Sequence, residues 1–279
     1  MDAEQLLREG NPRQALQALQ ARVREAPADA SLRVFLFQLL AVLGSWERAR
    51  TQLDVAGELD ASALGMVAVY RQALQAEGLR AEVFAGRRTP VVFGEPEEWI
   101  ALMFEALRLT ALGRDAESQQ ARARAFDAAP ATAGRLDGEP FEWIADADPR
   151  LGPMLEAVVN GRYYWVPFAR IRRLVIEAPT DLRDLVWTPA FITWANGGEA
   201  AALIPTRYPG SEQSEDPQIQ LARRTEWLAG QAELYVGRGQ RMLATSAGEY
   251  PLLQVREIVL EAAGAPAAAP APEGKEPSG

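Results

Sequence analysis

The chain has 279 residues, enough for two modules that each bury a core, and its 48% hydrophobic and 24% charged residues are typical of a folded soluble protein. The net charge of -9 disfavours partners with a phosphate backbone and anionic membrane surfaces, so we expect no nucleic-acid binding and no membrane binding. Because the sequence contains neither cysteine nor histidine, it excludes disulfides, Cys/His zinc sites, cysteine nucleophiles and serine-histidine-aspartate triads.

The start of the chain, MDAEQLL, lacks the cationic and apolar regions of a signal peptide. The most apolar stretch, 34–44, is shorter than the roughly 18 residues that a membrane span needs. We therefore expect a cytoplasmic protein.

Apolar residues at helical spacing predict that residues 1–130 form a helical repeat domain, an α-α superhelix. The chain resembles itself at an offset of 34, which is the tetratricopeptide (TPR) period. The matching positions are Leu6, Gly10, Ala15 and Leu19, which recur as Leu40, Gly44, Ala49 and Leu53. In such a repeat a small residue permits a tight turn between two antiparallel helices, and the leucines fill the seam between them.

The repeat weakens further along the chain. Leu74 and Gly78 continue its phase once more, but a loop rich in turn residues predicts an insertion near 86–96. Gly113 and Pro130 then restore the spacing seen earlier between glycine and proline. We therefore expect degenerate TPR-like pairs up to about residue 130.

Residues 131–262 predict a tryptophan-rich, mostly antiparallel β domain, which makes the fold class α+β. We expect one leading helix, with Pro153 in its first turn, MLEAVV as its body and the Asn-Gly pair at 160–161 as its stop. The sequence NGG at 196–198 predicts a hairpin turn between two strands. Residues 263–279, rich in alanine and proline, predict a disordered tail.

Two acidic motifs are candidates for chemistry. Asp146 and Asp148 in IADADPR could bind Mg²⁺, but we favour a turn or an ion pair with a residue such as Arg150. The charges at 181–184 in APTDLRDLVW predict an ion-pair cluster that fixes a loop. A carboxylate-dependent, metal-assisted enzyme using Asp146, Asp148 and Asp184 is our alternative function. We expect no catalytic residues, no metal and no other cofactor.

The helical repeat is the feature that best indicates function, because stacked helix pairs form a concave surface suited to an extended peptide or an amphipathic helix. Polar positions on or beside the apolar helical faces are our predicted partner-binding residues: Gln5, Arg8, Arg33 and Gln38. In the alternative interpretation the helices only support the β domain. The seven tryptophans are expected mainly in the core, and an RNA-binding surface built on them is disfavoured by the net charge.

Several long motifs in the same order, among them VFAGRRTPVVFGEPEEWIALM, FEWIADADPRLGPMLEAVVNGRYYWVPFARI and GQRMLATSAGEYPLLQVREI, resemble the ImpE family, also called TagJ. These are accessory proteins of the bacterial type VI secretion system, and the resemblance covers Ala3 to about Glu261. It implies a cytoplasmic, non-enzymatic adaptor that binds the N-terminal helix of the small sheath subunit. It also implies an influence on sheath assembly or on recycling by the ClpV AAA+ ATPase, which the adaptor could reach indirectly.

Overall fold

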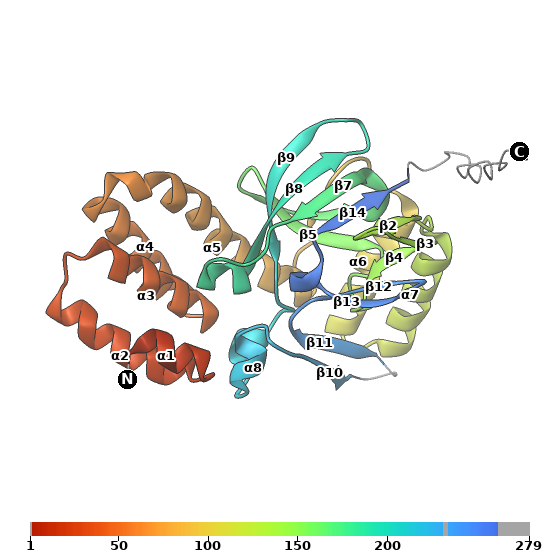
Figure 1. Ribbon diagram of the computed structural model, residues 1–279. Coiled ribbons are helices and arrows are strands. Elements are labelled where there is room, and N and C mark those ends of the chain that lie inside the picture. The colour runs from red at the N-terminus through yellow and green to blue at the C-terminus, as the bar shows by residue number, and fades with distance from the viewer. Residues whose placement is uncertain (1, 231–233, 262–279) are drawn as a thin grey trace, which may run out of the picture.

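The computed structural model describes residues 2–230 and 234–261, so the predicted tail at 263–279 lies outside the described residues. The first half of the chain is helical and the second half is rich in strands (Figure 1). The helices of the first half are α1 (Ala3–Arg8), α2 (Pro12–Glu25), α3 (Ala30–Val42), α4 (Trp46–Leu59), α5 (Leu64–Phe84), α6 (Glu98–Ala111) and α7 (Asp115–Ala128). Within the described ranges, no helix is both long and apolar enough to cross a membrane.

Local sequence signals define the helix pairs. Gly10, Gly44 and Gly113 end α1, α3 and α6 with φ values of 81°, 68° and 70°, a backbone region that glycine adopts without a steric penalty. The Asp29 carboxylate accepts a hydrogen bond from the backbone N–H of Leu32 at 3.1 Å and so caps the N-terminus of α3. The structure therefore confirms the predicted glycine turns at these three positions.

The extension of the repeat phase to Gly78 is wrong. Gly78 lies inside α5, and the left-handed glycine that follows this helix is Gly86, with φ 67°. Buried positions continue at helical spacing beyond Gly78, at Arg80 and Val83. This packing outweighs the cost of about 1 kcal/mol for one glycine in a helix. The predicted insertion does interrupt the helices, and it contains the short strand β1 (Val91–Val92).

The main sheet has the strand order β1-β6-β5-β9-β8-β7-β14-β2-β3, and every neighbouring pair except β1 and β6 is antiparallel. Its remaining strands are β2 (Gly134–Leu136), β3 (Glu139–Phe141), β5 (Met154–Val159), β6 (Arg162–Pro167), β7 (Ile171–Ile176), β8 (Trp187–Trp194), β9 (Glu199–Pro205) and β14 (Glu257–Leu260). The NGG segment connects β8 to β9, which confirms that hairpin. This architecture agrees with the predicted α+β class.

Two smaller sheets and several short helical segments complete the described part of the β-rich half. One sheet has the order β13-β12-β4, and the other pairs β10 with β11. Their strands are β4 (Ile144–Asp146), β10 (Thr225–Ala229), β11 (Tyr235–Gly239), β12 (Met242–Thr245) and β13 (Gly248–Pro251). The helical segments used below are the 3-10 turn η3 (Leu182–Leu185) and the helix α8 (Pro217–Gln220).

The predicted leading helix at 154–159 is a strand, β5. All six of its residues are buried, and β5 lies between β6 and β9 in the interior of the sheet. A strand covered on both faces has a continuous apolar sequence, which periodicity cannot distinguish from a short buried helix. Asn160 (φ 47°) and Gly161 (φ 75°) form the hairpin turn to β6 rather than a helix stop.

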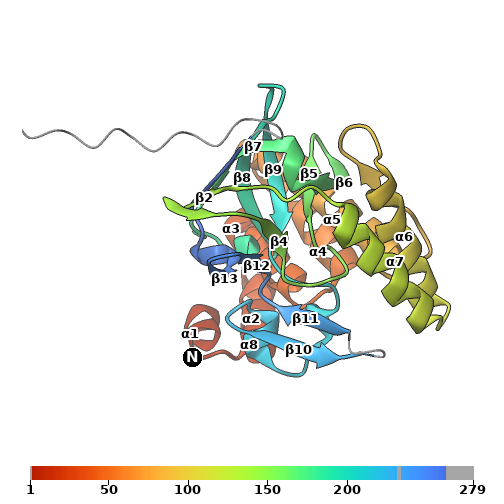
Figure 2. The ribbon, with the colours of Figure 1, turned by 90° about the vertical axis from the view of Figure 1, so that its right-hand side faces the viewer.

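The largest apolar cluster continues from the helices into the sheet. The Trp187 ring of β8 lies 6.0 Å from Trp46 of α4 and 5.9 Å from Tyr70 of α5, while α3 packs against η3. Figures 1 and 2 show α6 and α7 on the other flank of the molecule from α1, with strands between them. The β-rich half therefore covers much of the inner surface that the repeat would otherwise expose.

Candidate interaction surfaces and the buried polar junction

Gln5 and Arg8, two of the predicted partner-binding residues, lie together on α1. The Arg8 guanidinium donates to Gln5 Oε1 at 2.8 Å, and Gln5 Nε2 donates to Glu9 Oε1 at 2.6 Å. Arg8 is exposed and Gln5 is half-buried. Both polar groups therefore remain accessible on one side of a short helix.

Arg33 and Gln38 lie elsewhere. Five residues apart on α3, they point about 140° away from each other around the helix axis. Arg33 donates to the Pro27 carbonyl at 2.9 Å and to Gln52 Oε1 at 2.8 Å, which ties α3 to α4. Gln38 is 5% exposed, and its amide lies 3.4 Å from Asp181 Oδ1. The four predicted residues thus do not line one groove, and Gln38 is an internal contact because the β-rich half covers this part of α3.

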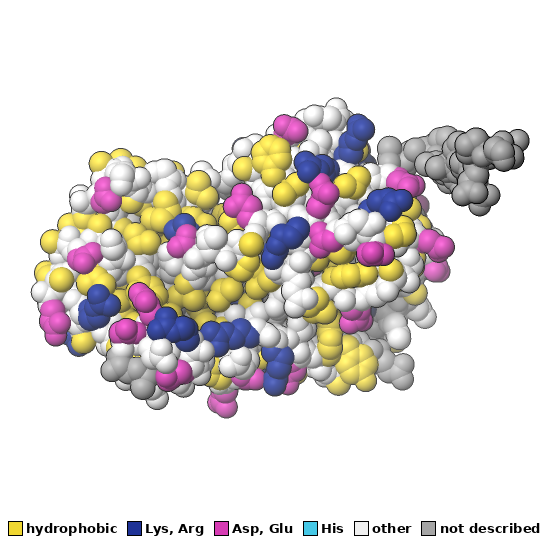
Figure 3. Space-filling view, in the orientation of Figure 1, with side chains coloured by type: hydrophobic (Ala, Val, Ile, Leu, Met, Phe, Trp, Pro, Cys, Tyr) yellow, Lys and Arg dark blue, Asp and Glu magenta, His cyan; other side chains and the backbone are white. Residues whose placement is uncertain are grey.

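An apolar groove remains open between α5 and the sheet. Its volume is about 480 Å³, and its walls include Val69 and Tyr70 of α5 and Phe191 and Leu203 of the β8-β9 hairpin. Val69 and Phe191 are 46% and 43% exposed, which is unusual for large apolar side chains. In Figure 3 apolar side chains gather over the helical half and along its boundary with the sheet. Polar side chains at the groove include Glu177.

A fully buried ionic network connects the two halves of the chain. Glu156 of β5 accepts hydrogen bonds from Arg80 Nε at 2.7 Å and Arg80 Nη2 at 3.0 Å, and also from Arg241 and the Tyr163 hydroxyl. Arg241 in turn donates to Asp146 Oδ2 at 2.8 Å. Because Arg80 belongs to α5 and the other charged members to the β-rich half, this network fixes the helices against the sheet.

Burial and ion pairing act in opposite directions on the two carboxylates. Burial alone would raise the pKa of Glu156, but the attraction of Arg80 and Arg241 outweighs it and holds the pKa at about 2. For Asp146 burial prevails over the attraction of Arg241 and raises the pKa to about 7. Glu156 is therefore the permanent anion of the network, and Asp146 titrates near neutral pH.

Arg207 makes a second connection between the halves. Its guanidinium donates to the carbonyl oxygens of Val42 at 2.8 Å and Ala41 at 3.4 Å, at the C-terminal end of α3, and to the carbonyl of Gln220 at 2.5 Å. A cation is favourable at this end of a helix, where the last carbonyls lack partners. Burial lowers the pKa of Arg207 to about 10, so the side chain stays charged at neutral pH.

The carboxylates of the alternative enzyme hypothesis are used within the fold. Asp146 is paired with Arg241, and Asp148 is paired with Arg150 at 2.6 Å. Asp184 accepts hydrogen bonds from the backbone N–H groups of Thr180 and Asp181, at 2.9 Å each, and forms a capping box at the start of η3 together with Asp181, the N-cap residue. In the part of the chain that the structure describes, no three acidic side chains are arranged to hold a metal ion. The three-carboxylate site is therefore wrong, because each carboxylate is already neutralised or capped locally.

The expected structural roles of both acidic motifs are confirmed by the Asp148–Arg150 pair and by a 2.5 Å pair between Arg183 and Asp181. Sequence reasoning missed the buried network itself. One signal was present, since Glu156 is the only charged residue in the apolar run MLEAVV and a buried charge requires a partner. Its partners Arg80 and Arg241 carry no local signal.

Comparison with known proteins places this architecture in a family. Residues 138–259 match the family described as ImpE protein, and residues 6–66 match a tetratricopeptide repeat. The chain is 54% identical to the type VI secretion system accessory component TagJ of Pseudomonas aeruginosa over 94% of this chain and 92% of that protein. The chain belongs to the ImpE/TagJ family. A crystal structure of a Vibrio parahaemolyticus protein has the same fold, with a TM-score of 0.82 at 25% identity, over 93% of this chain and 97% of that one.

ImpE/TagJ membership supports a type VI secretion accessory role for this chain, and the TPR match agrees with an adaptor that acts through protein-protein contacts. The match at residues 6–66 covers α2, α3 and α4, where the 34-residue offset was visible in the sequence. The ImpE match covers most of the β-rich half and contains Glu156, Arg207 and Arg241. The repeat match ends before Arg80, so of the charged members of the buried network only Glu156, Asp146 and Arg241 lie within a matched segment.

Proposed function

We propose that this protein is a cytoplasmic, non-enzymatic adaptor that binds the N-terminal helix of the small sheath subunit of the type VI secretion system. Through this contact it would modulate sheath assembly or sheath recycling by the ClpV AAA+ ATPase. The family membership supports the secretion role, and the observation that carries the proposed binding mode is the apolar groove between α5 and the β8-β9 hairpin.

The groove has the chemistry that an amphipathic helix requires. A partner helix buries apolar residues at positions i, i+3 and i+4 in a hydrophobic groove, and Val69, Tyr70, Phe191 and Leu203 provide such a lining. Val69, Tyr70 and Gln72 contribute one turn of α5 to the wall, so the groove offers contacts to about one or two turns of a docked helix. Glu177 beside the groove would favour a basic residue on the partner's polar face.

Calorimetric titration of the full chain with a synthetic peptide of that sheath helix, from the same genome, tests the proposal. Phe191→Asp places a charge in the groove and should weaken binding at least tenfold, about 1.4 kcal/mol. The control Leu112→Asp replaces a 58% exposed apolar residue after α6 and should leave the affinity unchanged. Circular dichroism of both variants checks that they are folded.

Arg8→Glu distinguishes the groove from the α1 surface, where Gln5 and Arg8 remain accessible. Loss of binding in Arg8→Glu, with normal binding in Phe191→Asp, would move the partner helix to α1. If the unmodified chain binds no sheath helix at all, the proposed partner is wrong. For the ClpV step, the rate of sheath disassembly by ClpV should change on addition of the unmodified chain and should not change on addition of Phe191→Asp.

A further inference from the structure

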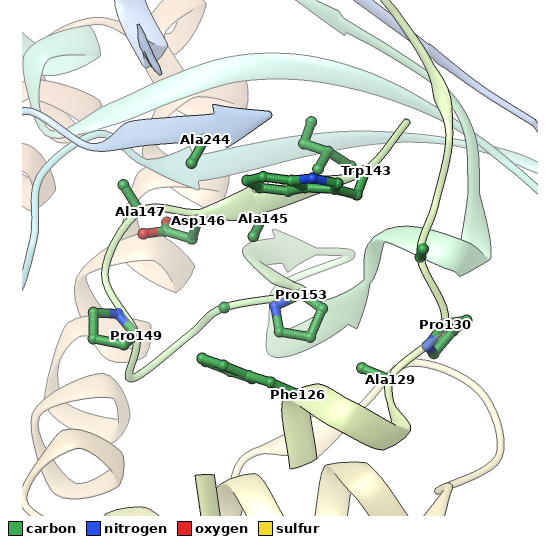
Figure 4. Close-up of a pocket in the computed structure, with 13 residues that line it drawn as sticks. Phe126, Ala129, Pro130, Trp143, Ala145, Asp146, Ala147, Pro149, Pro153 and Ala244 are labelled. Atoms are coloured by element: carbon green, nitrogen blue, oxygen red, sulfur yellow. The ribbon is translucent and has the colours of Figure 1, made fainter. Parts of the chain in front are cut away.

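Two tryptophans, Trp143 and Trp227, are the most exposed in the chain, at 42% and 36%. Trp143 borders a pocket of about 410 Å³, but Pro153 already lies between its ring and the facing ring of Phe126 (Figure 4). Trp227 lies instead in β10, which pairs with β11 at the lower margin of the molecule in Figures 1 and 2. Because this sheet has only two strands, the other edge of β10 has no strand beside it among the described residues.

The free edge of β10 is unusual for this fold. The other ends of the described sheets are protected, because β1 has two residues, β3 and β4 have three each and β13 ends at Pro251. The outer side of β11 is covered by Tyr208, whose backbone N–H donates to the Gly239 carbonyl at 2.9 Å. In contrast, β10 has five residues and no proline. Soluble monomers avoid such an edge, since its unpaired backbone groups are a template for another strand.

The hydrogen bonds of β11 show which backbone groups of β10 are unpaired. The N–H of Gly237 donates away from β10, to Asp148 Oδ2 at 2.9 Å. In an antiparallel pair, two residues that lie opposite each other either bond to each other or both point their backbone groups outward. Gly237 lies opposite Trp227, so the N–H and C=O of Trp227 point away from β11. The same holds for Thr225 and Ala229, because the two kinds of pair alternate along the strands. No backbone group of the described residues bonds to these outward groups.

A second copy of β10 complements this edge. When two copies run antiparallel with Trp227 at the centre, Trp227 lies opposite Trp227 of the other copy, and Thr225 lies opposite Ala229. The Trp227 pair and the two Thr225–Ala229 pairs can each exchange two hydrogen bonds, which uses every outward group. Glu226 then lies opposite Leu228, so no like charges face each other across the contact.

We propose that β10 pairs with β10 of a second copy of this chain, so that two copies form a four-stranded antiparallel sheet centred on Trp227. The indole is held in place for this contact, because its ring centroid lies 5.7 Å from that of the fully buried Tyr208. Aromatic side chains that lie opposite each other stabilise antiparallel strands. The contact involves fewer residues than the roughly 20–30 per chain of a stable interface, so the dimer forms reversibly. In Figure 1 the β8-β9 hairpin lies at the opposite margin from β10, so the groove beside α5 stays free in both copies.

Cysteine cross-linking of the full chain tests the register. Because the sequence has no cysteine, Thr225→Cys and Ala229→Cys each introduce a single thiol. In the proposed dimer the two positions lie opposite each other with their Cα atoms about 5.5 Å apart, which permits a disulfide. Each position lies about 13 Å from its own equivalent, because four residues separate them along the strand. Under mild oxidation, a mixture of the two variants should therefore give at least about tenfold more covalent dimer than either variant alone. Val259→Cys, at a 40% exposed position of β14, is the matched control and should not cross-link with either variant.

Sedimentation equilibrium tests the contact without cross-linking. The unmodified chain should dimerise reversibly between about 1 and 200 μM, the range of a small, transient interface. Ala229→Pro removes an outward N–H that only the second copy uses, and proline is tolerated at such a position of an edge strand. Its circular dichroism should match that of the unmodified chain, while its dimer dissociation constant should rise at least about tenfold. Val259→Glu should leave the constant unchanged.

A chain that stays monomeric up to about 200 μM would overturn the proposal and leave the edge of β10 to a strand of a different protein. Equal dimerisation of Ala229→Pro and the unmodified chain would also overturn it. Loss of the dimer in Val259→Glu, with a normal dimer in Ala229→Pro, would move the contact to the main sheet. Covalent dimer formed as readily by Thr225→Cys alone as by the mixture would refute the register centred on Trp227.

Discussion

The buried network makes a strong prediction about stability. Glu156→Gln keeps the shape of the side chain but removes the charge that Arg80 and Arg241 share, at a position with no solvent exposure. Two guanidinium groups then compete for Asp146 and for Glu77, which lies 3.6 Å from Arg80. Removal of one partner from a buried ion pair typically costs about 3–5 kcal/mol, and we expect a loss of about 3 kcal/mol because the amide retains some hydrogen bonds.

Urea denaturation followed by tryptophan fluorescence and by far-ultraviolet circular dichroism measures this loss. With an m value of about 3 kcal/mol/M, a loss of about 3 kcal/mol lowers the urea midpoint by about 1 M. The control is Glu257→Gln, which breaks the exposed pair with Arg173, whose side chains are 41% and 51% exposed. An exposed pair contributes at most about 1 kcal/mol, so the midpoint of this variant should move by about 0.3 M or less.

Equal midpoints for the two variants would refute the reasoning, because the buried network would then contribute no more than a surface pair. The two probes should also report the same transition in the unmodified chain. One apolar cluster and the Arg80–Glu156 pair both connect the helices to the sheet, so neither half can lose its packing alone. Separate transitions for the helices and the strands would contradict this coupling.

Three further results are expected. The raised pKa of Asp146, about 7 in the folded chain against 3.8 normally, means that the native state binds the extra proton. The free energy of unfolding should therefore fall as pH rises from about 4 to 7. Asp146→Asn should remove that fall, which urea midpoints at pH 5 and 7.5 measure. A difference in midpoint between the two proteins that is the same at both pH values would contradict the raised pKa of Asp146. Gly113→Ala, at φ 70°, should lower the free energy of unfolding by about 1 kcal/mol. Gly78→Ala, inside α5, should raise it by about 0.5–1 kcal/mol. A change in the same direction for both variants would contradict the revised repeat boundary. Saturating Mg²⁺ should leave the melting temperature unchanged, since Asp146, Asp148 and Asp184 are already engaged, and a clear increase would restore the metal-site hypothesis.

The candidate surfaces were only partly predictable. Gln5 and Arg8, three positions apart, share one side of α1, because side-chain direction on a helix is a local property, and their role in partner binding stays a prediction. Gln38 has the same apparent pattern but is buried against Asp181, a residue 143 positions further along the chain. Phe191 could not be assigned to the groove from its strand alone, because the opposite wall comes from α5.

The sequence by itself determined the features that depend on neighbours in the chain. The 34-residue offset, the turn glycines at Gly10 and Gly44, the NGG hairpin and the α+β class follow from periodicity and from backbone conformations that few residues adopt. The lack of cysteine and histidine likewise restricts the chemistry without any structure.

The tertiary structure alone decided the state of the apolar run at 154–159 and the partners of the buried charges. That run is a strand because β6 and β9 flank it, a condition set by segments elsewhere in the sequence. Glu156 meets Arg80 and Arg241 across 76 and 85 residues. A buried charge requires a counter-charge, but which arginine supplies it depends on how the halves pack, and no local pattern encodes that choice.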